Sequence, residues 1–334
     1  MTKFLFCFFL SLSSFFFASE EELPDVGVTY TLSGGRFGDN LLSLLHAKWI
    51  SYKYHLPLLY QPFPYSSELV LDREKIHFDI SQKNHFDKSI RLGRKQYVKA
   101  HWKGSLLYIS PYFPEAKYEI AHTRPCIEDR KHGWPYFRVD WHDPEFRKEA
   151  LRVITLQKPV QTVRVPSDRI TIALHIREGG GFDDPRSVAL SFPWKAPPFH
   201  FYVDGLKKVL GLLPQKKIYC YLFTDAKDPA SLVKKIQQEM PSDAPIEFDF
   251  RKTGNRHDAN VLEDFFSLFL FDILIRPDSN FSLVPSLLHD YAILVTPGHF
   301  TTTSKNTIEV DEFSIVLDHK LYRNLLLSKQ SEAN

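Results

Sequence analysis

The stretch VGVTYTLSGGRFGDNLLSLLHAKWISYKYHLPLLY, residues 26–60, predicts a strand, a turn, a helix and a second strand in that order. Residues 26–32 have a strand-like pattern, and the glycine-rich segment 33–38 follows them directly. From 39 to 54 apolar residues recur at helical spacing, and residues 57–60 predict the next strand. This β-loop-α-β opening is typical of an α/β fold.

The second half of the chain continues this alternation more clearly. We predict strands at 170–176, 218–223, 246–248, 273–275 and 292–295, which alternate with helices at 199–213, 229–240, 260–270 and 281–288. Such alternation implies a parallel sheet with helices on both faces. Residues 61–150 have weak periodicity, and we expect irregular structure with short helices there.

We therefore predict two facing Rossmann-like domains, residues 20–160 and 161–325, with a ligand cleft between them. The boundary falls in a segment near 158–168 that contains Pro and Ser. A chain of 334 residues is long enough for two domains. Ligands of open α/β sheets bind at the carboxyl ends of the strands, which suits a cleft between two such domains.

Residues 1–19 have the pattern of a signal peptide. Lys3 supplies positive charge, residues 4–17 form an apolar run, and small Ala18 and Ser19 precede three Glu. The run is shorter than the roughly 20 apolar residues that a membrane span needs. We expect an exported protein. The alternative is that residues 1–19 stay as an uncleaved anchor, and only in that case do we expect the protein to associate with a membrane.

Composition excludes some classes of function. The net charge is +2, from 42 basic and 40 acidic side chains, which gives no argument for nucleic acid. The 14 His are dispersed without a close Cys/His cluster, so we predict no metal site. Cys126 and Cys220 could form a disulfide in an oxidising compartment, or Cys220 could be a buried thiol, and Cys7 lies in the leader.

The glycine-rich turn is the first candidate site. Gly35 and Gly38 lie where the predicted strand meets the predicted helix, so the backbone can approach a ligand closely. Asp39 stands near the helix start, where backbone N–H groups favour an anion. The alternative is that the glycines only form a tight turn.

His175 and Arg177 form the second candidate site, at the end of the strand at 170–176. Strand alternation directs both side chains to the same face. The guanidinium of Arg177 can donate to two phosphate oxygens at once. Three glycines, at 179–181, follow directly and remove side-chain bulk. The alternative is a structural His with an Arg salt bridge.

Two further candidate sites lie after a strand and at the start of a helix. Asp225 follows the strand at 218–223, and its alternative role is an N-cap or turn. Asp264 lies in the predicted helix at 260–270, and Ser279 and Ser282 lie at the start of the next helix. Hydroxyls at a helix start can hold a phosphate or sugar, although Ser is more often only an N-cap there.

In order and content, these motifs resemble the fucosyltransferase superfamily. Gly35-Arg36-Phe37-Gly38 resembles the Gly-Arg-Phe-Gly-Asn-Gln opening motif of protein O-fucosyltransferases and is similar to that of α-1,2-fucosyltransferases. His175-Ile176-Arg177 resembles the family's His-x-Arg signature. Residues 261–288 are similar to its closing motif, in which an Asp-containing helix precedes a strand and a Ser-rich turn.

The resemblance implies a GT-B-like glycosyltransferase with a GDP-sugar co-substrate and neither cofactor nor metal. It implies that the enzyme transfers fucose from GDP-fucose to a glycan or glycoprotein acceptor with inversion of configuration. Residues 20–160 would form the acceptor side. Arg177 would bind the diphosphate and stabilise the leaving GDP as a catalytic residue, and Asp264 would accept hydrogen bonds from guanine. The other implied donor contacts are Gly35, Arg36, Gly38, Asp39, Asn40, His175, Asp225, Ser279 and Ser282.

The sequence departs from the family pattern at Asp39, where Asn is usual, and at Asn40, where Gln is usual. Glu178 and three glycines replace the usual charged continuation after His-x-Arg. The sugar and the general base therefore stay open, with Glu178, Asp183 and Asp184 as candidate bases.

Two other classes of function remain as alternatives. One is a non-catalytic sugar- or nucleotide-binding protein on the same scaffold. The other is an unrelated exported hydrolase, which the lack of a Gly-x-Ser-x-Gly elbow disfavours.

Overall fold

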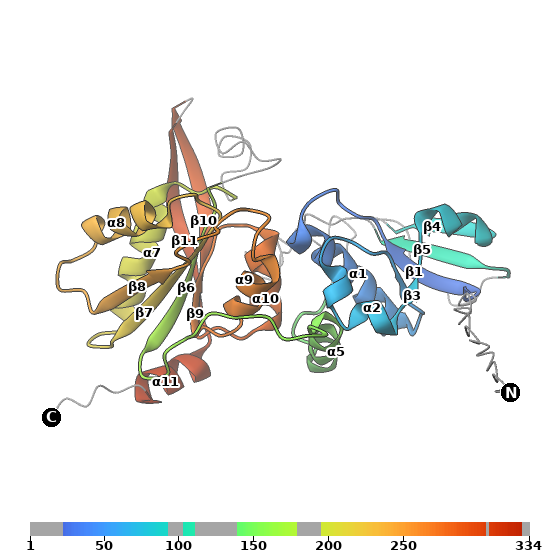
Figure 1. Cartoon of the computed structure of the whole chain (residues 1–334), viewed down its shortest axis with the longest axis horizontal. Coiled ribbons are helices and arrows are strands. Elements are labelled where there is room, and N and C mark those ends of the chain that lie inside the picture. Colours follow the sequence, from blue (N-terminus) through green and yellow to red (C-terminus); the bar gives the residue numbers. More distant parts are fainter. Residues whose placement is uncertain (1–22, 93–102, 111–138, 179–194, 305–306, 329–334) are drawn as a thin grey trace, which may run out of the picture.

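Figure 1 shows the computed structural model of the chain, which describes residues 23–92, 103–110, 139–178, 195–304 and 307–328. The predicted leader, Cys126 and the candidate bases Asp183 and Asp184 lie outside these ranges. Among the described residues, no helix combines the length and the apolar character that a membrane crossing requires.

The first half of the chain forms a small parallel sheet in the order β1-β5-β4. Its strands are β1 (Val26–Tyr30), β5 (Leu106–Ser110) and β4 (Lys88–Arg91). Two of them lie in the region predicted to be irregular, so that prediction was incomplete. The short strands β2 (Leu59–Tyr60) and β3 (Ile76–His77) pair with each other in parallel.

Between residues 23 and 92, four helical segments accompany this sheet: α1 (Phe37–Tyr54), the 3₁₀ segments Ser66–Glu68 and Ile80–His85, and α2 (Leu71–Glu74). Helix α1 begins two residues before the predicted start, because the Arg36 N–H donates to Oδ2 of Asp39 at 3.3 Å and fixes the first turn. Helix α5 (Pro144–Ile154) follows later in the chain. Short helices were expected up to residue 150 without bounds, and α5 was not placed, although Asp143 before a proline is a recognisable helix start.

The second half forms a larger sheet in the order β11-β10-β9-β6-β7-β8. Its members are β6 (Ile170–Ile176), β7 (Ile218–Thr224), β8 (Ile246–Phe250), β9 (Ile273–Ile275), β10 (Ile293–Ser304) and β11 (Thr307–Leu317). All neighbours are parallel except β10 and β11, which form an antiparallel hairpin. The predicted parallel sheet is confirmed, and the hairpin at its edge was not foreseen.

The described residues of this half form five helices: α7 (Phe199–Leu212), α8 (Pro229–Glu239), α9 (Val261–Leu268), α10 (Asn280–Leu288) and α11 (His319–Ser328). Figure 1 shows α9 and α10 between the two sheets, next to α1. The α/β class with parallel sheets is therefore confirmed. The division into two domains near residue 160 stays a prediction.

The apolar core of the first half extends into α9 and α10. Leu41 and Leu45 of α1 share one buried cluster with Phe265 of α9 and with Leu283 and Leu287 of α10. A second cluster covers the larger sheet and includes residues of α7 and α8. Helix α10 thus packs on α1, which brings the starts of both helices to one place.

Gly38 permits this close packing. A Cβ atom at Gly38 would lie 2.6 Å from the backbone nitrogen of Phe281, far inside contact distance. Only glycine therefore lets the first turn of α1 approach the first turn of α10. The packing fixes how the sequence motifs of the two halves face each other.

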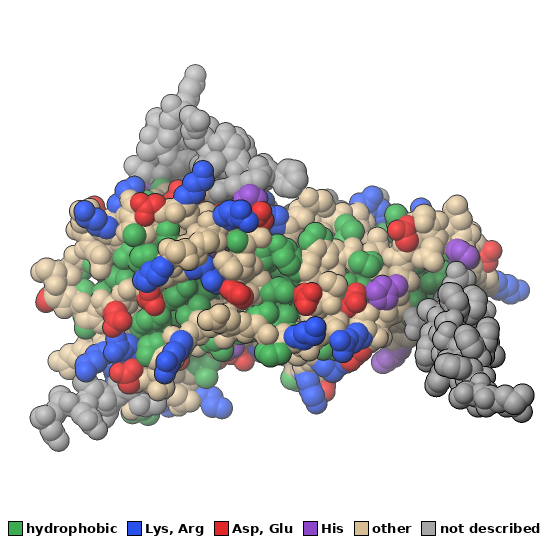
Figure 2. Space-filling view, viewed as in Figure 1, with side chains coloured by type: hydrophobic (Ala, Val, Ile, Leu, Met, Phe, Trp, Pro, Cys, Tyr) green, Lys and Arg blue, Asp and Glu red, His purple; other side chains and the backbone are tan. Residues whose placement is uncertain are grey.

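Positive and negative side chains are interspersed on the described part of the face shown in Figure 2. This distribution agrees with the net charge of +2, and it shows no broad field of one sign there.

Candidate functional site

A cavity of about 620 Å³ lies where the motifs of the two halves meet. Its volume is in the range of small-molecule sites. The first half contributes residues 33–39, Pro64 and Tyr65. The second half contributes His175, Arg177, Lys195, Phe223, Thr224, Asp225, residues 256–259, Val261, Asp264, Ser279, Asn280 and Phe281.

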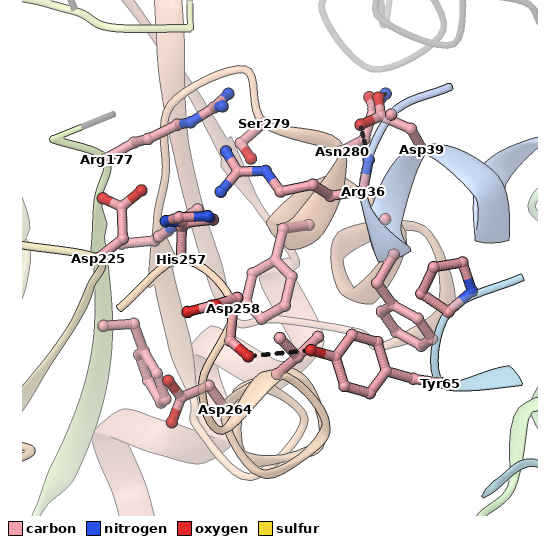
Figure 3. A pocket seen from close by; sticks show the side chains of 18 of the residues that line it. Arg36, Asp39, Tyr65, Arg177, Asp225, His257, Asp258, Asp264, Ser279 and Asn280 are labelled. Carbon is pink, nitrogen blue, oxygen red and sulfur yellow. Dashed lines mark hydrogen bonds between the residues drawn. The ribbon is translucent and has the colours of Figure 1, made fainter. Parts of the chain in front are cut away.

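Two arginines enter this cavity from opposite halves of the chain. Arg36 immediately precedes α1, and Arg177 immediately follows β6. Figure 3 shows both guanidinium groups directed into the same part of the cavity. Burial and the neighbouring charge of Arg36 lower the pKa of Arg177. Two like charges held this close favour an anionic ligand that interacts with both.

The start of α10 lies in the same part of the cavity. Ser279 is its N-cap, and the Ser279 side chain makes no capping hydrogen bond. Ser279, Asn280 and Phe281 all line the cavity. Backbone N–H groups at a helix start attract anions, so α10 reinforces the two arginines.

His175 precedes Arg177 by two residues and is almost fully buried. Its Nδ1 is 2.7 Å from Oγ of Ser282, which accounts for the orientation of the ring. Burial and the charge of Arg177 lower the pKa of His175 to about 3, so the imidazole is neutral at physiological pH. His175 lines the cavity, but the buried Ser282 does not. Ser282 thus contacts His175, and its predicted contact with a phosphate stays a prediction.

Asn40 also lies outside the cavity lining. Its Oδ1 accepts from the Ser33 N–H at 3.1 Å, and its Nδ2 donates to the Gly35 carbonyl at 3.1 Å. Asn40 thereby holds the glycine-rich turn in shape. Gly35, Arg36, Gly38 and Asp39 line the cavity, and their contacts with a donor stay a prediction.

The carboxylates after β6 and β7 occupy different positions. The Glu178 N–H donates to Oδ1 of Asp225 at 2.8 Å. Asp225 lines the cavity, whereas Glu178 is exposed and lines a neighbouring hollow that also contains Asp225. Glu178, the candidate base that lies within the described residues, is therefore outside the lining of the cavity that contains Arg177.

The opposite end of the cavity has a different character. Asp264 lies there, away from the guanidinium groups of Arg36 and Arg177 (Figure 3). Arg251 donates to Oδ1 of Asp264 at 2.6 Å. Burial raises the pKa of the Asp264 carboxyl, and the bond to Arg251 opposes that rise. This end therefore offers a carboxylate acceptor that is paired with a cation.

Tyr65 closes this end from the first half. Its hydroxyl donates to the Asp258 carbonyl at 3.0 Å (Figure 3). Tyr65 and Arg251 were not predicted from the sequence. Arg251 directly follows β8, so the strand-end rule that identified Arg177 would have found it if β8 had been predicted at its full length.

Two predictions concern metals and thiols. No group of three or more His, Cys, Asp or Glu residues that could hold a metal ion occurs in the described ranges. Cys220 is a buried free thiol, and burial raises its pKa well above the usual value. The possible pairing with Cys126 falls outside the described residues.

The sequence matches no family model and no curated protein. Its fold is similar to NodZ α-1,6-fucosyltransferase of Bradyrhizobium soaked with GDP-fucose, at 14% identity over 87% of this chain and 98% of that one, with a TM-score of 0.48. It is similar to an Arabidopsis thaliana FUT1 mutant in complex with GDP, at 14% identity over 83% and 71%, with a TM-score of 0.49. A third similar structure is POFUT1 in complex with GDP-fucose, at 10% identity over 82% and 96%, with a TM-score of 0.41.

Proposed function

We propose that the protein is a glycosyltransferase that uses a GDP-sugar, with GDP-fucose as the first donor to test. The observation that carries the proposal is the pair Arg36 and Arg177, which enter one cavity from opposite halves beside the start of α10. Two guanidinium groups and a helix N-terminus suit a diphosphate. Asp264 at the far end suits the N1–H and 2-amino donors of guanine.

The same arrangement supports metal-independent departure of GDP. Negative charge develops on the β-phosphate when the bond to the sugar breaks. Arg36, Arg177 and the N–H groups of α10 would stabilise that charge in place, in a site already organised for it. An acceptor hydroxyl would attack from the opposite face of the sugar and invert its configuration, while a carboxylate takes the proton.

The acceptor and the compartment are further parts of the proposal. The sequence motifs resemble enzymes that modify glycans or proteins, and we propose an exported glycan or glycoprotein as acceptor. The pattern of residues 1–19 supports entry into the secretory pathway, with an uncleaved anchor as the alternative.

Calorimetric titration with GDP, ADP and UDP in the presence of EDTA tests the donor site. We expect GDP-selective binding in the wild type and its loss in Arg177→Ala. Arg169→Ala, which removes the ion pair with Glu247 at the start of β6, is the matched control and retains binding. A wild type that does not bind GDP contradicts the proposal.

A non-catalytic GDP-sugar-binding protein is the second candidate. It is favoured by the engagement of three cavity carboxylates: Asp39 accepts from Asn280, Asp225 from the Glu178 N–H, and Asp264 from Arg251. Incubation with GDP-fucose separates the two candidates. Release of GDP supports the enzyme, and tight binding without any release supports the binding protein.

A further inference from the structure

Arg251 lies beside the cavity end that contains Asp264, outside the diphosphate region. It directly follows β8, and its NH2 group is 2.6 Å from Oδ1 of Asp264 and 3.0 Å from Oε2 of Glu263. The Nε atom of Arg251 is buried and has no hydrogen-bond partner among the described residues. The guanidinium is thus directed at the two carboxylates at the start of α9.

Asp264 is held by one oxygen only. Oδ1 accepts from Arg251, and Oδ2 makes no hydrogen bond to the described residues. The side chain is 20% exposed and lines the cavity, so Oδ2 is available to a ligand. A single strong charge-assisted bond fixes the orientation of such a carboxylate and stabilises its charge.

The loop that carries Arg251 is itself held in place. Nδ2 of Asn255 donates to the Arg251 carbonyl at 2.7 Å, and Nδ2 of Asn260 donates to the Gly254 carbonyl at 3.2 Å. These bonds tie residues 251–260 into one turn before α9. Arg251 and Asp264 are therefore placed relative to each other by local structure on both sides of the ion pair.

We propose that Arg251 determines base selectivity by holding Asp264 as an oriented carboxylate whose free oxygen accepts from guanine. This inference rests on the proposed GDP-sugar site and assigns a positioning residue to it. A carboxylate accepts from the N1–H and the 2-amino group of guanine. Adenine and uracil do not present this pair of donors, and hypoxanthine lacks the 2-amino group.

Removal of the cation tests this role. In Arg251→Met we expect affinity for GDP to fall about tenfold or more, because the acceptor Asp264 loses the charge-assisted bond that orients it and stabilises its charge. Affinity for ADP and UDP stays near the wild-type value, because the diphosphate region is intact. Selectivity for GDP over ADP therefore falls by the same factor. Arg251→Lys, which keeps the charge but not the planar fork, gives an intermediate loss.

A gain of function provides the second measurement. Asp264→Asn replaces an acceptor oxygen by an NH2 donor, which suits the 2-carbonyl of xanthine. We expect this variant to bind xanthosine diphosphate better than GDP. In the Asp264→Asn background, Arg251→Met then changes xanthosine diphosphate affinity less than threefold, since Arg251 acts through the charge of Asp264.

The outcomes separate this inference from the proposed function. Arg169→Met is the control, because it removes an arginine that is paired with a carboxylate outside the cavity lining, and we expect it to keep the wild-type GDP/ADP selectivity. A wild type that binds GDP, with a folded Arg251→Met or Arg251→Lys variant that keeps the full GDP/ADP ratio, overturns this inference alone. A wild type that binds no nucleoside diphosphate overturns the proposed function and this inference together.

Discussion

Nδ2 of Asn280 donates a 2.6 Å hydrogen bond to Oδ1 of Asp39, although the two residues lie 241 positions apart. Asn280 opens α10, and Asp39 lies in the first turn of α1. Both line the cavity, so this bond joins the two helix starts at the place where we propose that the diphosphate binds. The carboxylate of Asp39 also lies near Arg177, whose charge it favours.

Asp39→Asn is expected to strengthen GDP binding about two- to fivefold, since exposed or half-buried charge interactions contribute up to about 1 kcal/mol. The amide oxygen can still accept from Asn280, while the negative charge that repels a diphosphate is removed. Isothermal titration with GDP measures the effect. Asp143→Asn, at the N-cap of α5, is the control and leaves affinity unchanged. Weaker binding by Asp39→Asn would show that the carboxylate supports the site.

Gly38→Ala is expected to destabilise the fold by about 2 kcal/mol, within the range for overpacked sites. The added methyl would lie 2.6 Å from the backbone nitrogen of Phe281, and backbone cannot move aside as a side chain can. Gly211→Ala, in α7 with open space around its Cβ position, is the control and is expected to stabilise by up to about 1 kcal/mol. Urea unfolding of both variants provides the measurement, and equal stabilities would contradict the proposed steric role.

Much of the second half could be predicted from the sequence, because its elements are continuous apolar runs. The strand at 170–176 has the predicted bounds. All seven of its residues are buried, and the mostly apolar segment that results is easy to recognise as a strand in the sequence. Strands β4 and β5 were missed, because they are only four and five residues long and lie among polar and aromatic residues without alternation. The β10–β11 hairpin was missed because β10 continues to Ser304, past the apolar segment at 292–295 that the pattern detects.

Residues of the candidate site could be predicted only where the position of a residue along a strand determines the direction of its side chain. His175, Arg177 and Asp225 follow from the strand-end rule, and all three line the cavity. For helix starts, the rule gives the place but not the direction of each side chain. Asn40 and Ser282 therefore lie outside the cavity lining, although their neighbours Asp39 and Phe281 line it. Tyr65 reaches Asp258 through tertiary packing, which no local pattern reveals.

The stability of the fold is expected to fall as pH decreases from about 6.5 to 4. Burial lowers the pKa of His46 to about 4, and burial with the charge of Arg177 lowers that of His175 to about 3. In the unfolded chain both groups titrate near 6.5. The unfolded state therefore binds more protons in this window, so stability is present above pH 6.5 and is lost below it.

The test is urea unfolding at several pH values between 7.5 and 5. Each fully titrating group contributes a slope of about 1.4 kcal/mol per pH unit. His46→Gln removes one of the two groups, so its slope is shallower by about that amount, whatever its stability at pH 7.5. An unchanged slope in His46→Gln would rule out this contribution of His46.

The pair Arg36 and Arg177 is expected to behave as one anion site. Each single change to Met should weaken GDP binding about tenfold or more, since a charged hydrogen-bond donor is lost. The double variant should lose less than the sum of the two free energies, because either single change already releases the diphosphate from its bridging position. Guanosine, which lacks phosphates, provides the control within each variant, and its affinity should not change. Strict additivity for GDP, or an equal loss for guanosine, would mean that the two arginines do not share a diphosphate.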